Sequence, residues 1–278
     1  MSGETKVVVI SLPDAADRRA AFADRARVTS IPWTWFDAHR VLAPGLTHEP
    51  DEAIVAKGRP MYPGELGCYS SHYAAWSMFL ESGASRMLVL EDDTIVDWGF
   101  LETLVTVDLQ AAGVHYLKLY AERPCALREV LRHAIEQQRT LVEFLDRPLG
   151  TQGYVVTREG AERFVRHCRR VLRPLDDELD RSWEHGVPCL GILRPLDDEL
   201  DRSWEHGVPC LGIFPFPLLE QSTSSTIGPA RFGRFTIPGR LLARRQAMKM
   251  RDRALRLRQR LRLLTAGRPA ALQSLVAS

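Results

Sequence analysis

This sequence has no closely spaced pair of cysteines and no long apolar run. Its 278 residues include five cysteines, none in a C-x-x-C pair, which excludes the common zinc and redox signatures. We therefore expect reduced thiols, as in the cytosol. No apolar run approaches the roughly 20 residues that a membrane-spanning helix needs. A strand predicted at residues 6–10 also leaves no room for a secretory signal at the start.

Biased composition is absent as well. Hydrophobic residues make up 45% of the chain and charged residues 26%, which is the mix of an ordinary globular protein. This composition excludes a disordered chain, a collagen-like fibre and a disulfide scaffold. A chain of this length forms one large domain or two small ones.

Acidic residues are nearly absent from the C-terminal end. Residues 231–278 hold 13 of the 37 lysines and arginines but one of the 35 acids, so this tail carries a formal charge of +12. Residues 1–230 then carry 24 − 34 = −10. An acidic body with a basic tail indicates that the tail meets something anionic: membrane headgroups, nucleic acid or an acidic glycan.

From Pro238 the tail has the pattern of an amphipathic helix, with basic residues at most positions outside an apolar stripe. The stripe consists of Leu241, Met248 and Leu255, with Leu257, Leu261 and Leu264 beside it. This composition is typical of helices that lie at a membrane interface. We predict that residues 238–264 bind an anionic membrane surface; the alternatives are a helix packed on the body and a disordered end.

The first residues predict an α/β fold. Residues 6–10 form a continuous β-branched run, typical of a buried strand. A turn follows, and residues 15–26 have a helical pattern with Asp14 as a plausible N-cap. A strand, a short loop and a helix in this order favour a parallel sheet.

Further elements follow the same alternation. Strands are predicted at 33–36, 86–90, 116–120 and 153–156, and helices at 67–82 and 158–171. Thr157 is the expected cap of the last helix. Residues 37–63 have little periodicity and are predicted to be a polar loop.

A tandem duplication interrupts this pattern. Residues 172–192 recur without a change as residues 193–213. Each copy predicts a short helix with acidic residues at its start, a glycine stop, and a strand that is 187–192 in the first copy. Because two identical sequences cannot occupy one place in a fold, we expect one copy to fill the native position and the other to form a surface insertion.

Two segments carry candidate chemistry. Glu91-Asp92-Asp93 follows a buried strand directly, and crowded carboxylates repel one another unless a cation or hydrogen bonds stabilise them. Glu91 and Asp93 would suit Mg²⁺ or Mn²⁺; the alternative is a solvated acidic turn. The second segment is glycine-rich and ends at His72, which could act as a base or contact phosphate at a helix start, or be structural.

Together these segments resemble glycosyltransferase family 25, the lipopolysaccharide-type galactosyltransferases related to collagen galactosyltransferases. The resemblance covers residues 6–228 and leaves out the tail. Its motifs are VVVISLPDAADRRAAF, Phe36-Asp37-Ala38, PGELGCYSSHYAAW, MLVLEDD, Leu117-Lys118, GTQGYVVTREGAERF and PLDD. Ser11 replaces an expected asparagine, and the duplication doubles a segment that the family has once.

The resemblance implies a GT-A-like nucleotide-sugar-binding fold over residues 1–230, with a mostly parallel central sheet flanked by helices. It also implies a UDP-sugar donor and Mn²⁺ (or Mg²⁺) held by Glu91 and Asp93. The implied donor-binding residues are Arg18, Arg19, Glu65, Ser71, His72, Asp92 and Lys118. Tyr154 would pack or position the acceptor.

The catalytic base remains open between the two copies. A carboxylate near the acceptor hydroxyl is the usual base for inverting transfer. The candidates are Asp176 and Asp177 in the first copy and Asp197 and Asp198 in the second. The first copy keeps the spacing from Tyr154, and the second keeps the spacing to Gln221.

We therefore expect a bacterial-type transferase that moves a hexose, galactose first, from a UDP-sugar to a glycan or glycolipid such as lipopolysaccharide core. It would be cytoplasmic and peripheral on the inner face of the cytoplasmic membrane. The alternative is a catalytically impaired UDP-sugar-binding relic damaged by the duplication. Nucleic acid is not an expected partner, because the basic tail lacks interleaved aromatic residues and a recognisable binding module.

Overall fold

The computed structural model describes residues 4–193, 216–220, 235–267 and 269–277. An eight-stranded sheet with the order β2-β1-β3-β8-β5-β9-β7-β6 lies at its centre. The strands are β1 (Thr5–Ser11), β2 (Thr34–Asp37), β3 (Arg86–Glu91), β5 (Tyr116–Lys118), β6 (Leu127–Arg132), β7 (Thr140–Phe144), β8 (Gly153–Thr157) and β9 (Leu190–Leu193). A second, two-stranded sheet pairs β4 (Thr94–Val96) with β10 (Leu218–Glu220).

Six of the eight strands of the central sheet run in one direction. β1 is parallel to β2 and β3, and β9 is parallel to β5. Only β7 and β8 are reversed within this sheet, since their pairings are all antiparallel. The predicted α/β class with a mostly parallel sheet is confirmed. The carboxyl ends of β1, β3 and β5 and the amino end of β8 therefore share one edge.

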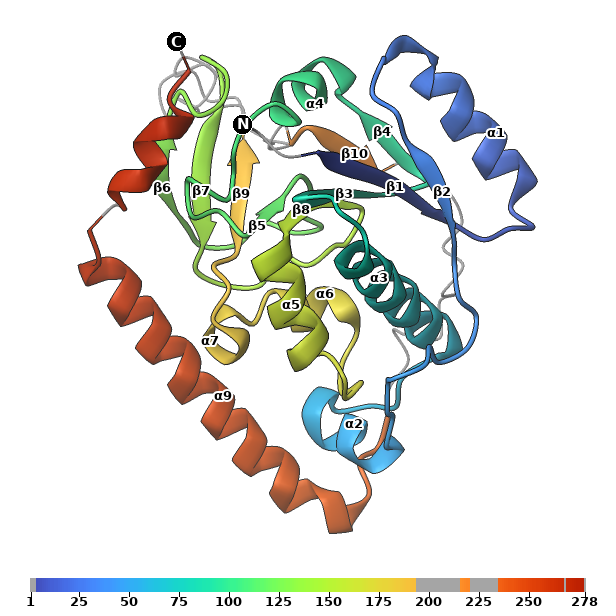
Figure 1. The fold of residues 1–278 in the computed structure, drawn as a ribbon. Coiled ribbons are helices and arrows are strands. Elements are labelled where there is room, and N and C mark those ends of the chain that lie inside the picture. Colours follow the sequence, from blue (N-terminus) through green and yellow to red (C-terminus); the bar gives the residue numbers. More distant parts are fainter. Residues whose placement is uncertain (1–3, 194–215, 221–234, 268, 278) are drawn as a thin grey trace, which may run out of the picture.

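Helices cover both faces of this sheet (Figure 1). On one face lie α3 (Pro63–Glu81), α5 (Arg158–His167) and α6 (Leu175–Leu179); on the other lie α1 (Ala16–Arg25) and α4 (Trp98–Leu104). Successive strand residues point to opposite faces, so Val8 belongs to the first core and Val7 to the second. Strands buried on both faces give continuous apolar runs, which makes β1 and β3 recognisable in the sequence.

Two local predictions are wrong. The N-cap of α1 is Ala15, without a side-chain hydrogen bond, because the Asp14 carboxylate pairs with Arg40 instead. The segment predicted as a loop at 37–63 contains the helix α2 (Pro50–Lys57). Its residues 53–56 are all buried, so the helix lacks the alternation of apolar and polar residues that reveals an amphipathic helix. By contrast, Thr157 caps α5 as predicted, accepting a hydrogen bond from Gly160.

The first copy of the duplication fills a native position in the fold. It forms α6, α7 (Ser182–His185) and most of β9, which is hydrogen-bonded between β5 and β7. Gly186 ends α7 in the left-handed conformation, as the predicted glycine stop requires. The second copy lies outside the described residues except for Leu193, the last residue of β9.

The basic tail forms the helix α9 (Gly239–Thr265) and a short 3-10 helix, η3 (Ala270–Leu275); another 3-10 turn, η1 (Ala26–Val28), follows α1. α9 packs against α2 and α7 (Figure 1). Its arginines pair with acids of the body, for example Arg244 with Glu52 and Arg260 with Asp146. The helix is thus packed on the body, and acidic residues of the body pair with some of its basic side chains. Among the described helices, none combines the length and apolar character needed to span a membrane.

Candidate active site

A cavity of about 530 Å³ opens at the carboxyl edge of the central sheet, the place where open α/β sheets bind ligands. Its walls are the end of β1, the residues after β3, the loop before β8 and the first turns of α3 and α6. Among the described residues, seven carboxylates and four basic side chains line it. They are Glu65, Glu91, Asp92, Asp93, Glu122, Asp176 and Glu220, with Arg18, Arg40, Lys57 and Arg59.

The predicted acidic triplet lies in this cavity, and its three carboxylates have different partners. Asp92 is buried, accepts a hydrogen bond of 2.6 Å from the Ser11 hydroxyl and pairs with Arg18. Asp93 shares Arg18 through Oδ2 at 3.0 Å, while its buried Oδ1 has no hydrogen-bond partner among the described residues. Burial, together with the charges of Glu91 and Asp92, raises the pKa of Asp93 to about 7. Asp92 is therefore held inside the protein, and Asp93 is the member with unused coordinating capacity.

Glu91 is fixed by two neighbours. The Thr151 hydroxyl donates a hydrogen bond of 2.6 Å to Glu91 Oε1, and His72 Nε2 lies 3.4 Å from the same oxygen. Burial alone would raise the pKa of Glu91, but His72, Thr151 and Arg18 lower it below its ordinary value. Glu91 thus remains a carboxylate at the wall of the cavity.

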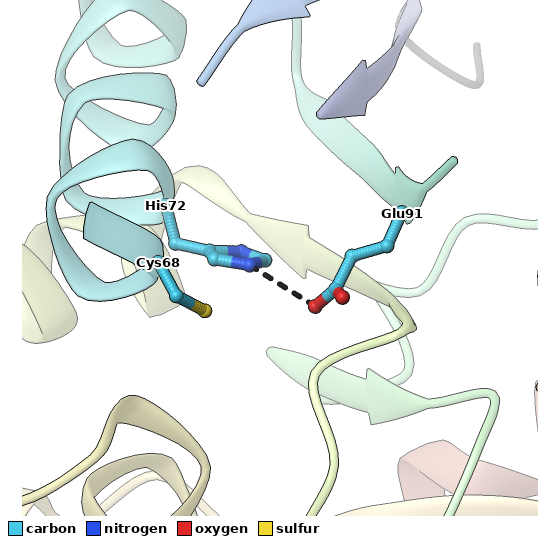
Figure 2. Close-up of side chains that lie close together, drawn as sticks. All are labelled: Cys68, His72 and Glu91. Atoms are coloured by element: carbon cyan, nitrogen blue, oxygen red, sulfur yellow. Dashed lines mark ion pairs between the residues drawn. The ribbon is translucent and has the colours of Figure 1, made fainter. Parts of the chain in front are cut away.

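The side chains of Cys68, His72 and Glu91 point toward one another (Figure 2). Their ligand atoms lie within 4.8 Å of each other, and the two residues from α3 are one helical turn apart. A sulfur, a nitrogen and a carboxylate oxygen form a donor set that suits zinc better than manganese. Glu91 therefore belongs to two groups that could hold a cation: this one, and the predicted pair with Asp93.

His72 is oriented from the protein interior. Its Nδ1 lies 2.9 Å from the Tyr154 hydroxyl, which accepts a hydrogen bond of 2.8 Å from Trp76 Nε1. All three side chains are fully buried. Tyr154 does not line the cavity, so it packs behind His72 and sets the direction of the imidazole.

The predicted donor residues at the start of α3 line the cavity, but their polar atoms bind protein groups. Glu65 accepts the Tyr62 N–H at 3.0 Å and pairs with Arg59, which is the capping contact expected at a helix start. Ser71 accepts the His39 N–H at 2.8 Å and donates to the Gly67 carbonyl at 2.7 Å. Both residues hold the cavity wall in place.

The two arginines of the opening motif, Arg18 and Arg19, make different contacts. Arg18 reaches into the cavity and bridges Asp92 and Asp93. Arg19 does not line the cavity; it donates to the Ser11 carbonyl at 2.9 Å and pairs with Asp37, which joins the ends of β1 and β2.

Lys118 lies in the interior and does not line the cavity. Its Nζ is 2.9 Å from Asp180 Oδ1 and donates to the Leu149 carbonyl at 2.9 Å. Burial would lower the pKa of Lys118, but the Asp180 carboxylate raises it above its ordinary value. Asp180 also accepts the Leu149 N–H at 2.6 Å. The pair therefore holds the loop that carries Thr151 to Glu91.

The candidate bases separate in the structure. Asp176 lines the cavity. Asp177 is buried outside the cavity lining and pairs with Lys57 at 2.9 Å and with Arg147. Burial would raise the pKa of Asp177, but these two cations lower it well below its ordinary range. Asp197 and Asp198 lie outside the described residues.

Sequence reasoning missed three basic residues of the cavity and two residues that support it. Arg40, Lys57 and Arg59 come from the segment predicted as a loop, whose basic residues were its only available signal. Thr151 and Asp180 have no signature of their own. Their roles depend on contacts with Glu91 and Lys118, which are 60 and 62 residues away in the chain.

Comparison with known proteins identifies several to which this chain is similar. The chain is 29% identical over 155 residues to procollagen galactosyltransferase 1 of Danio rerio, covering 55% of this chain and 26% of that protein. It is 30% identical over 178 residues to the lacto-N-neotetraose biosynthesis glycosyltransferase LgtE of Neisseria gonorrhoeae, covering 60% and 61%. LgtB of Neisseria meningitidis is 28% identical over 184 residues, covering 60% and 64%. The chain thus spans less than two thirds of each relative.

A solved structure was also matched: a glycosyltransferase involved in the glycosylation of the major capsid of PBCV-1. It is 11% identical, covers 89% of this chain and 99% of its own, and has a TM-score of 0.32, a likeness too weak to add to the argument. A family model, "Glycosyltransferase family 25 (LPS biosynthesis protein)", matches residues 4–179. Because this match covers more than half of the chain and contains the motifs that line the cavity, the chain belongs to glycosyltransferase family 25.

Proposed function

We propose that this chain transfers a hexose, galactose being the first candidate, from a UDP-sugar to a hydroxyl of a glycan or glycolipid such as lipopolysaccharide core, with inversion. Family membership supports glycosyl transfer. The names of relatives that include a procollagen galactosyltransferase and two lacto-N-neotetraose biosynthesis enzymes support the sugar and the kind of acceptor.

The charge balance of the cavity carries the proposal. The seven carboxylates and four basic side chains that line the cavity within the described residues give a formal charge of −7 + 4 = −3 when all are ionised. A diphosphate would be repelled by this surplus on its own. A diphosphate entering with a divalent cation would be attracted, because the cation interacts favourably with the carboxylates and the basic side chains with the phosphates.

Glu91 and Asp93 fit such a cation. Within the part of the chain that the structure describes, Asp93 Oδ1 is buried without a hydrogen-bond partner, and burial beside Glu91 and Asp92 raises the pKa of Asp93 to about 7. Both observations describe a carboxylate whose charge is compensated only in part, because its cationic partner, Arg18, is shared with Asp92. Oxygen ligands of this kind suit Mn²⁺ or Mg²⁺. When bound, the metal would stabilise the negative charge that develops on the departing UDP.

The chain's own residues would complete the chemistry. Arg18 holds Asp92 and Asp93 in place, and His72 and Thr151 fix Glu91. Arg40, Lys57 and Arg59 line the same cavity and are the basic side chains that we propose contact the phosphates. Asp176, a cavity carboxylate in the first turn of α6, would accept the proton of the acceptor hydroxyl as it attacks the sugar carbon. Asp177 is a poorer base, since two cations lower its pKa.

Calorimetric titration tests the donor half. UDP-galactose, UDP-glucose and UDP-N-acetylglucosamine are titrated with and without Mn²⁺ into the wild type and Asp93→Asn. We expect one sugar nucleotide to bind in a metal-dependent manner. Asp93→Asn should weaken that binding by at least about tenfold, since loss of metal-site contacts costs this much in affinity.

Asp24→Asn is the matched control. Asp24 is a surface carboxylate, 69% exposed and paired with Arg27 outside the cavity, so this variant should bind like the wild type. Metal-independent binding, or no binding of any of the three nucleotides, would refute the donor proposal. Tight binding without transfer to any acceptor would instead favour the relic, in which the duplication has impaired the acceptor side.

A further inference from the structure

Helix α9 has an inner face that is bound to the body along the whole length of the helix. Leu241 is 3% exposed and packs with Ile54 and Val55. Arg245 donates to the Val55 and Lys57 carbonyls at 3.0 and 2.9 Å. Near the other end, Arg256 and Arg260 pair with Asp146 at 3.1 and 2.9 Å. These contacts fix the rotation of α9 about its axis.

The outer face of α9 exposes a second apolar stripe. Met250 is 70% exposed, Leu257 59%, Leu261 55% and Leu264 70%. At about 100° per residue, these four side chains fall within about 60° of one another and about 180° from Leu241. A hollow beside them is lined by residues of α9 alone, including Leu257 and Leu261. The described part of the chain leaves this stripe uncovered.

Basic side chains border the stripe on both sides. Lys249 and Arg253 lie on one side, and Arg251 and Arg258 on the other, by the same helical geometry. Arg262 lies beyond Arg258 and lines the hollow together with Leu257 and Leu261. All five are exposed. Within the described residues, none of the five takes part in an ion pair, in contrast to the arginines of the inner face.

From these two faces we infer that α9 is a membrane-docking helix, whose outer face lies on an anionic lipid surface while its inner face holds the body. Apolar residues bordered by cations match the acyl boundary and the anionic headgroups of a bilayer surface. A second copy of the chain would bring like charges together. Nucleic acid would leave the apolar stripe against phosphates, and α9 contains no aromatic residue to stack on bases.

Flotation of the full-length protein with vesicles tests this inference. The vesicles contain phosphatidylcholine alone or phosphatidylcholine mixed with phosphatidylglycerol, and no sugar nucleotide is present. A failure of the proposed transferase activity therefore leaves this test intact, and the reverse is also true. We expect binding to the anionic vesicles only, falling strongly between about 0.05 M and about 0.5 M salt as the charges are screened.

Two matched double variants test the orientation. Arg258→Gln/Arg262→Gln removes two charges from the outer face, and Arg256→Gln/Arg260→Gln removes two from the inner face with the same spacing. The outer pair should lower the lipid partition coefficient by at least about tenfold, since each basic residue near the surface contributes about fivefold. The inner pair should change it far less. Leu257→Gln/Leu261→Gln should also reduce binding without lowering the melting temperature, because both side chains are exposed.

Other results would contradict the proposed orientation of α9 or assign its outer face to a different partner. Equal loss in the two arginine pairs would show that only total charge matters and would overturn the assigned face. Absence of binding to anionic vesicles would overturn the inference outright. A dimer that is seen by light scattering and abolished by Leu257→Gln/Leu261→Gln would overturn it too, because a second copy would then cover the stripe. Full competition between duplex DNA and the vesicles would overturn it in favour of nucleic acid.

Discussion

Two adjacent aspartates in the first repeat copy have opposite environments. Asp176 lines the cavity, whereas Asp177 is 2% exposed and paired with Lys57 and Arg147. Adjacent helical residues point about 100° apart, so one turn of helix can place one carboxylate in solvent and the other in the interior. The two residues are therefore expected to respond differently to the same substitution.

We predict that Asp176→Asn lowers the transfer rate by about 10²- to 10⁴-fold, the usual contribution of a general base. Binding of the donor should change little, because the substitution leaves the metal-binding carboxylates intact. Asp177→Asn should instead destabilise the fold by about 2–3 kcal/mol, since two partly buried cations lose their counter-charge. Single-turnover kinetics and urea unfolding of both variants measure this contrast; the reverse pattern would make Asp177 the base.

His185 is a second residue whose environment determines its protonation. Its Nε2 lies 3.0 Å from the Leu179 carbonyl, and its Nδ1 accepts the Val187 N–H at 3.1 Å. Only the neutral ring can donate from one nitrogen and accept at the other. Burial, reinforced by the neighbouring His167, lowers the pKa of His185 to about 4 from 6.5.

The unfolded state therefore binds a proton at His185 below pH 6.5, while the folded state binds it only near pH 4. The stability that neutral His185 provides should be lost as the pH falls through this window, by up to about 3 kcal/mol. We predict that the difference in unfolding free energy between the wild type and His185→Gln shrinks by this amount from pH 7.5 to 4 (about 1.4 kcal/mol per unit at most). A difference that stays constant with pH would show that His185 has the same pKa in the folded and unfolded states, and so would contradict the prediction.

At the scale of elements, the start of α3 depends on a close backbone contact. A Cβ added at Gly67 would lie 2.6 Å from the His39 carbonyl oxygen. This contact brings the segment around Ala38 and Arg40, part of the cavity wall, against α3. Glycine is therefore required here by the approach of another segment and not by a turn within the helix.

We predict that Gly67→Ala costs about 1–3 kcal/mol, the range for inserting an atom into a packed site. The melting temperature should fall by about 3–10 °C, as expected for a domain of this size. Gly83→Ala is the control, because nothing lies within 4 Å of a Cβ added there. Calorimetric melts of the two variants make the comparison. Equal melting temperatures would mean that the 38–40 segment moves away without cost.

At the scale of the whole molecule, the duplication does not prevent the fold from forming around a single copy. The first copy supplies α6, α7 and three residues of β9, and it places Asp176 in the cavity. The connection from β9 to β10 comprises residues 194–217. Because the copies are identical, deleting either one produces the same chain.

We predict that deleting residues 193–213 keeps the protein folded and raises its stability by up to about 2 kcal/mol, since a shorter loop loses less entropy on closure. In this variant Phe214 directly follows Ile192. Urea unfolding and donor titration of the deletion variant provide the readout. Lower stability or lost donor binding would indicate that the second copy takes part in the native structure.

The sequence by itself determined the alternation of strands and helices, because β1 and β3 are buried on both faces and appear as continuous apolar runs. It also placed the acidic triplet at the edge of the sheet and located α9 by its periodicity. These features are local, so neighbouring residues are enough to reveal them.

Only the tertiary structure decided which polar residues reach the cavity and which face of α9 remains exposed. Lys118 and Asp180 meet in the interior, Tyr154 lies behind His72, and α2 appears where no periodicity predicted a helix. Burial and pairing depend on segments that are distant in the chain. The type of a charged residue does not reveal whether its side chain is solvated or paired in the fold. The separation of Asp176 from Asp177, and of the two arginine faces of α9, arises for this physical reason.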